Sequence, residues 1–113
     1  MNISDYQTKA ARTTSTTVGF DPTEDQTILV WNALGLAGEA GEVADTVKKA
    51  VFHQHGLDLE KLKIELGDVL WYIAAICTQL DVKLEDVMQA NIDKLHARYP
   101  EGFSVEKSKN RAE

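Results

Sequence analysis

Apolar residues recur at the three- to four-residue spacing of an α-helix along most of the chain, and no segment alternates with the period of a strand. The longest helical pattern runs from residue 23 or 24 to about residue 53 and predicts one long helix, or two joined end to end. A second pattern, at 59–80, forms a stripe wide enough for a central bundle helix. A third, at 84–99, stops before Pro100, which cannot continue a helix.

Turn signals separate these helices. Gly56 is free to adopt the left-handed conformation that ends a helix, and Asp58 is placed to cap the next one. A weak apolar stripe from about Ser4 to Thr13 predicts a short first helix, and the threonine-rich segment before Pro22 reads as a loop or mobile lid.

The pattern as a whole predicts an all-α fold, a bundle of four to five helices in a single domain over residues 1–113. The N-terminal helix and loop take 1–22, and the core helices take 23–100. Residues 101–113 are expected to be a solvated tail, with Phe103 as its anchor.

Composition and charge narrow the class of protein. A chain of 113 residues, 43% of them hydrophobic, suffices for one core. Its single cysteine, Cys77, lies in an apolar run and is interpreted as a small buried hydrophobe in a reducing compartment. The net charge of −6 argues against a protein that binds a nucleic acid polymer by its phosphates. With no secretion-signal pattern and no apolar run long enough for a membrane span, we expect a cytoplasmic protein.

Two carboxylate pairs carry the candidate chemistry. Glu39 and Glu42 lie three residues apart in the long helix, as do Glu65 and Asp68 in the next one. That spacing puts both acids of a pair on one helical face, where like charges repel unless a cation lies between them. If the two helices are antiparallel, the pairs can converge on one site, whose hard oxygen ligands suit Mg²⁺ or Mn²⁺.

The alternative is that these acids lie on solvated helix faces, as a lone Glu-x-x-Glu usually does. Against it, both pairs are embedded among small and apolar residues, and a glycine directly precedes the second acid of each. Gly35, Gly38 and Gly41 lie three apart in the long helix, each at a cost of about 0.5–1 kcal/mol relative to alanine. Either close helix packing or room for a ligand would offset that cost.

Three segments resemble the MazG-like all-α nucleoside triphosphate pyrophosphohydrolases, which are related to dimeric dUTPases and to phosphoribosyl-ATP pyrophosphohydrolase. They are GLAGEAGEVADTVKKA at 35–50, ELGDVLWYI at 65–73 and NIDKLHARYPEGF at 91–103. The resemblance implies a Mg²⁺-dependent enzyme, with Mn²⁺ able to substitute, that hydrolyses an NTP or dNTP to the monophosphate and pyrophosphate. Clearing aberrant nucleotides is one role that this activity would allow.

The resemblance makes the four acids of the two pairs the magnesium ligands. One acid of the first pair, Glu39 or Glu42, is the expected water activator, because a carboxylate near a metal can accept a proton. The family's phosphate-contacting positions match Asn91, Lys94 and Arg98, although ordinary surface charge also explains Lys94 and Arg98.

For the nucleoside pocket we expect Tyr72 first, one turn after the second pair, then Trp31, since aromatic rings stack on bases. Asn32 is a hydrogen-bonding candidate, and Trp71 is interpreted as core. The wide stripe of the central helix predicts self-association, and the resemblance implies a homodimer or homotetramer. Two alternatives stay open: the same fold acting on phosphoribosyl-ATP or another nucleotide, and a non-catalytic, metal-binding helical interaction module.

Overall fold

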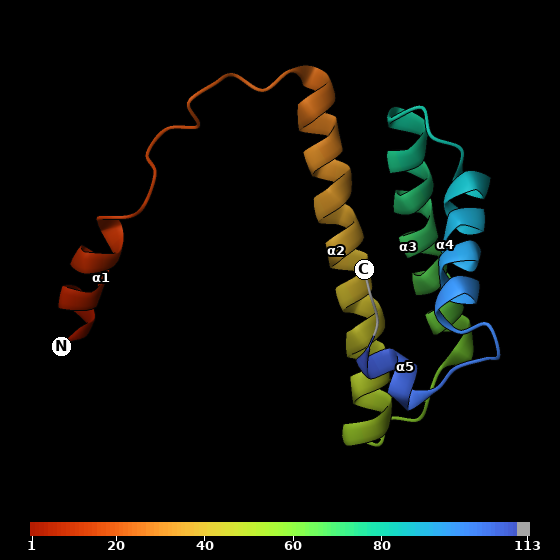
Figure 1. The fold of residues 1–113 in the computed structure, drawn as a ribbon. Helices are drawn as coiled ribbons and strands as arrows, with labels where there is room; N and C mark the ends of the chain where they lie inside the picture. Colours follow the sequence, from red (N-terminus) through yellow and green to blue (C-terminus); the bar gives the residue numbers. More distant parts are fainter. Residues whose placement is uncertain (111–113) are drawn as a thin grey trace.

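The structure, a computed structural model, describes residues 1–110, and this range contains helices and no strands. The helices are α1 (Ile3–Ala11), α2 (Glu24–Phe52), α3 (Leu59–Gln79), α4 (Leu84–Arg98) and α5 (Val105–Lys109). As Figure 1 shows, α2 and α3 are antiparallel neighbours, α4 lies along α3, and α1 stands apart at the end of an extended loop. The predicted all-α class, with four to five helices, is confirmed.

A single unbroken helix, α2, accounts for the long apolar pattern. It begins with a capping box, in which the Thr23 hydroxyl accepts from the Gln26 amide and the Gln26 side chain accepts from the Thr23 amide. The expected role of Gly56 in ending this helix was wrong. Gly56 does have a φ of +75°, but the chain already turns at Gln54, whose φ is +56°, and the His55 amide donates to the Lys49 carbonyl.

Local capping also defines the other helix ends. Asp58 caps α3 as predicted, since its carboxylate accepts from the Lys61 amide at 3.0 Å. At the other end of α3, Asp81 takes the left-handed conformation usual for glycine, with a φ of +55°. The Val82 amide donates to the Cys77 carbonyl at 2.8 Å, which completes a Schellman motif.

The predicted tail contains a helix that the sequence pattern did not reveal. Ser104 caps α5, with its hydroxyl accepting from the Lys107 amide at 3.1 Å. Phe103 remains 72% exposed, although its ring lies 5.3 Å from that of Tyr99. Phe103 is therefore a weak anchor at most.

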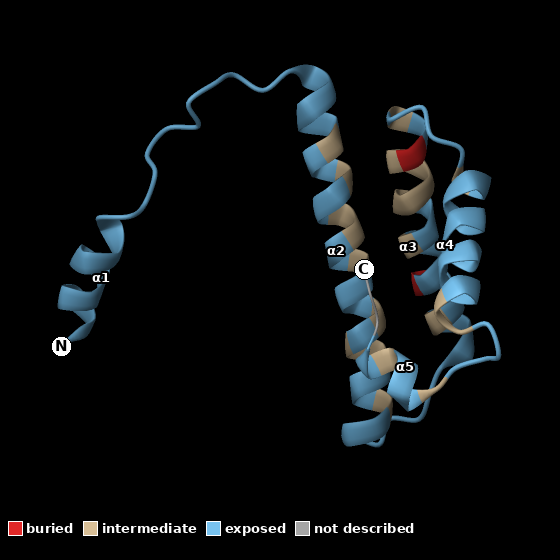
Figure 2. Ribbon diagram, in the orientation of Figure 1, coloured by how far each residue is buried: buried red, intermediate tan, exposed pale blue. Residues whose placement is uncertain are grey.

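The isolated chain has almost no core. Among the described residues only Cys77 and Glu65 are buried, at 9% and 7% exposure, and Figure 2 shows intermediate burial mainly where α2 and α3 face each other. The radius of gyration is 20.3 Å, against about 13 Å for a compact chain of this length. The accessible surface is 9651 Å², against about 6,200 Å² for a typical monomer of this mass. Within residues 1–110, no helix has the length and apolar character needed to cross a bilayer.

Candidate active site

Polar side chains recur along the seam between α2 and α3, the strip where the two helices face each other. On α2 they occur every seven residues at Asn32, Glu39 and Thr46, and on α3 at Glu65, Tyr72 and Gln79. All six are buried or half-buried. A seven-residue spacing keeps side chains on one side of a helix, and it separates successive positions by about 10 Å. Because the helices are antiparallel, the six residues form three layers.

The first layer pairs Thr46 with Glu65. Glu65 is only 7% exposed, and the Thr46 hydroxyl lies 2.8 Å from each of its carboxylate oxygens. A hydroxyl has one proton to donate, so it serves the two oxygens in turn. Thr46 was not identified from the sequence; the signal was its position seven residues after Glu39.

The middle layer pairs Glu39 with Tyr72, and it also includes Asp68, which lies one turn before Tyr72 on α3. Glu39 and Asp68 line a hollow of about 310 Å³ together with Trp71 and Tyr72. The Tyr72 ring occupies the space that a side chain at Gly35 would need: a Cβ there would lie 2.9 Å from Tyr72 Cδ1 and closer still to the ring's outer carbons. Of the two explanations for the glycines, close helix packing therefore applies to Gly35. Gly38 and Gly41, by contrast, have no atom within 4 Å of such a Cβ.

The chemistry of the middle layer fits a hard divalent cation, although the free chain does not present a finished site. Glu39 and Asp68 supply carboxylate oxygens from opposite sides of the seam, which are the ligands that Mg²⁺ prefers. The Glu65 carboxylate instead accepts a hydrogen bond from Thr46. Glu42 is exposed and does not line the hollow. Over residues 1–110, no three Asp, Glu, His or Cys side chains gather closely enough to hold a metal ion. The convergence of all four acids stays a prediction.

The third layer borders a second hollow of about 420 Å³. Its lining residues are Ile28, Asn32, Trp71, Ala74, Ala75, Thr78 and Gln79. Asn32 lines this hollow and not the one that Glu39 and Asp68 line, whereas Trp31 is 72% exposed and lines neither hollow. Trp71 was expected in the core, but it is 62% exposed and forms a wall shared by both hollows. Core packing fails for Trp71 because α3 is covered closely only by α2.

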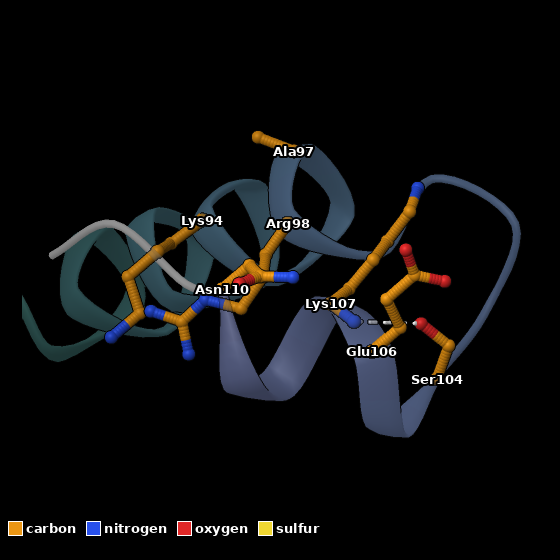
Figure 3. A pocket seen from close by; sticks show the side chains of 7 residues that line it. All are labelled: Lys94, Ala97, Arg98, Ser104, Glu106, Lys107 and Asn110. Atoms are coloured by element: carbon orange, nitrogen blue, oxygen red, sulfur yellow. Dashed lines mark hydrogen bonds between the residues drawn. The ribbon is translucent and has the colours of Figure 1, made fainter.

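The predicted phosphate-binding cations lie elsewhere in the chain. Lys94 and Arg98 line a pocket of about 510 Å³ between α4 and α5, whose other lining residues include Ser104, Glu106 and Lys107 (Figure 3). Asn91 is exposed and does not line this pocket. The carboxylate hollow is lined from α2 and α3 alone, so within one chain the cations and the carboxylates belong to different pockets.

Asp45, near the end of α2, is engaged by its own helix. Its carboxylate pairs with Lys49 at 2.8 Å and with Lys48 at 3.1 Å. Hydrogen bonds from Lys49 and then Lys48 lower the pKa of Asp45 to about 2. The same bond to Asp45 raises the pKa of Lys49. These three side chains therefore form an exposed ion-pair cluster one turn beyond Glu42.

Comparison with known proteins identifies the family. The model of the MazG nucleotide pyrophosphohydrolase domain matches residues 30–103, which contain both carboxylate pairs and all three layers of the seam. Gene 37 protein of Mycobacterium phage L5 is 41% identical over 87 residues, which cover 74% of this chain and 76% of that protein. No solved structure matches significantly. With its all-helical structure and this match over most of its length, the chain belongs to the MazG nucleotide pyrophosphohydrolase family.

Proposed function

We propose that the protein is a Mg²⁺-dependent nucleoside triphosphate pyrophosphohydrolase that converts an NTP or dNTP to the monophosphate and pyrophosphate. The observation that carries this proposal is the middle layer of the seam. There, one acid from each carboxylate pair, Glu39 and Asp68, lines a hollow next to the Tyr72 ring. Family membership supports the reaction class. We also propose a cytoplasmic location, because nucleotide pools occur there.

The two carboxylate pairs would hold the cation, with Glu39 and Asp68 already at the hollow and Glu42 and Glu65 one turn away on the same helices. When bound, Mg²⁺ neutralises negative charge on the phosphates. Glu39 or Glu42 accepts the proton of the attacking water. The water oxygen bonds to the α-phosphorus, the bond from that phosphorus to its bridging oxygen breaks, and pyrophosphate leaves with the bridging oxygen.

We propose further that the active form is a homodimer or homotetramer. The chain exposes about 3,500 Å² more surface than a typical monomer of its mass. That excess exceeds both the roughly 800 Å² per partner of a standard interface and the roughly 1,000–2,500 Å² per partner of most obligate assemblies. Association would also bring the α4–α5 pocket of one copy, with Lys94 and Arg98, near the carboxylates of another, where positive charge is needed to bind phosphates.

The test is product analysis with the purified chain, Mg²⁺ and a panel of nucleoside and deoxynucleoside triphosphates. Glu39→Gln and Glu42→Gln should each lower pyrophosphate release at least about 10²-fold, since each removes a ligand charge or the proton acceptor. Glu60→Gln, on the exposed face of α3, is the matched control and should retain the wild-type rate.

Each part of the proposal can be refuted separately. No turnover of any nucleotide by the wild type, or full activity in both glutamine variants, would refute the proposed enzyme mechanism. Release of orthophosphate would leave the site but refute attack at the α-phosphorus. Turnover of phosphoribosyl-ATP alone would change the substrate. Sedimentation of a monomer at micromolar concentration would separately refute the assembly.

A further inference from the structure

The third layer of the seam contains a hydrogen-bond acceptor with no donor. Gln79 Nε2 donates to the backbone carbonyl of Asp25 at 2.6 Å, a bond that joins the end of α3 to the start of α2. This bond fixes the orientation of the amide, because the reverse orientation would place two oxygens against each other. Gln79 Oε1 is then left buried, with no hydrogen-bond partner among the described residues. Buried acceptors are rarely left unpaired, so this oxygen indicates a missing donor.

The surroundings of Gln79 favour a flat, aromatic ligand. The hollow of about 420 Å³ that it lines has apolar walls from Ile28 and two alanines, the indole of Trp71 on one side, and the amide of Asn32. Apolar and aromatic walls with a few polar groups are typical of sites that bind small heteroaromatic molecules.

The position of this hollow links it to the middle layer. Trp71 separates the hollow from the one that Glu39 and Asp68 line, and seven residues of helix, about 10 Å, separate the two layers. Phosphates at the carboxylates therefore leave the base of the same nucleotide beside Asn32 and Gln79.

We infer, resting on the proposed function, that Gln79 selects nucleotides whose base carries an exocyclic amino group, with this group donating to Gln79 Oε1 while Trp71 packs against the ring. An oxo group at the same position presents a lone pair to the oxygen and leaves the acceptor unpaired. Asn32, with both a donor and an acceptor, meets the adjacent ring edge in either case. The oxygen is covered in the free chain, so the donor reaches it as side chains at the hollow shift on binding.

The experiment compares amino bases with their oxo counterparts, CTP with UTP and ATP with ITP, by kcat/KM. The wild type should prefer the amino member of each pair by about tenfold to a hundredfold, the effect of leaving one buried polar group unpaired. Gln79→Leu should bring the ratio close to one. Gln89→Leu makes the same change on α4, where the Gln89 amide donates to Asp93 on the same helix, and should leave the ratio as in the wild type.

A binding measurement makes the inference independent of turnover. In ¹⁵N-labelled protein, CMP should shift the Gln79 side-chain amide resonances at concentrations at least about tenfold lower than UMP does. Gln79→Met, which keeps the length of the side chain, replaces Gln79→Leu in the kinetic comparison if circular dichroism shows that the leucine variant is unfolded.

Equal affinity for CMP and UMP in the wild type overturns the inference, as does an amino preference that survives the loss of the Gln79 amide. A wild type that hydrolyses no nucleotide but binds CMP selectively refutes the proposed function and supports the role of Gln79. Turnover of nucleotides without any preference for amino bases supports the proposed function and refutes the role of Gln79.

Discussion

Replacing Gly35 by alanine adds one methyl group where α2 meets the Tyr72 ring, and the same change at Gly38 or Gly41 adds it to open space. All three glycines lie in the interior of one helix, so the gain in helix propensity is the same for each, about 0.5–1 kcal/mol. The three substitutions differ only in what the new Cβ meets.

At Gly35 the new methyl group must displace an aromatic ring. Overpacking of this kind costs about 1–3 kcal/mol, which exceeds the propensity gain. Gly35→Ala should therefore lower the free energy of unfolding by about 0.5–2 kcal/mol. Gly38→Ala and Gly41→Ala should each raise it by about 0.5–1 kcal/mol, so the sign reverses within two helical turns.

The assay is thermal and urea unfolding followed by circular dichroism at a fixed protein concentration, because association makes the midpoint depend on concentration. At about 4 °C per kcal/mol, the Gly35 and Gly38 variants should differ in Tm by about 4–12 °C. In a Tyr72→Leu background the clash is relieved, and Gly35→Ala should become stabilising. A stabilising Gly35→Ala in the wild-type background, or a loss unaltered by Tyr72→Leu, would refute the reasoning.

Three further predictions follow from single contacts. Thr46→Val removes the hydroxyl that donates to the buried Glu65 carboxylate and should lower the free energy of unfolding by about 1–3 kcal/mol, whereas Thr46→Ser keeps a hydroxyl and should lower it less. Equal losses for the two variants in urea unfolding would contradict the hydrogen-bonding role. The pKa of Asp45 is lowered from 3.8 to about 2, so its ion pairs stabilise the fold fully above pH 3.8 and lose that contribution as the pH falls through 2. A pKa near 3.8 for Asp45, measured by ¹³C NMR of its carboxyl carbon, would show that the pairs do not persist in solution. Asp81→Gly should stabilise the chain by up to about 1 kcal/mol, because glycine has no Cβ to strain at a φ of +55°, and a lower unfolding midpoint would argue against that conformation.

The helices were predictable from sequence because their signals are local. The capping box at Thr23, the cap at Asp58 and the break at Pro100 each act within one turn, so the predicted and observed bounds of α2, α3 and α4 differ by about one residue. The helix α5 has only five residues, too few for an apolar period to show. The turn at Gln54 also escaped prediction, since glutamine has no special preference for positive φ.

The carboxylate pairs were predictable from spacing within each helix, whereas the layers of the seam depend on the register between two helices. Nothing in α2 alone indicates that Thr46 faces Glu65, and nothing in α3 alone indicates that Gln79 reaches Asp25. The exposure of Trp71 was likewise hidden, because the wide apolar stripe of α3 does not reveal how few neighbours cover it in a single chain.

The isolation of α1 should be visible in the hydrogen exchange of its backbone amides. It has nine residues and stands apart from the other helices, and an Asn2 cap and its own backbone bonds stabilise it. Helices this short are marginal in water, and they unwind and re-form within about a microsecond. The amide protons of α1 should then exchange with solvent nearly as fast as those of an unfolded peptide. Slow exchange there would report that another surface covers Ile3 and Tyr6, which makes this helix a built-in probe of assembly.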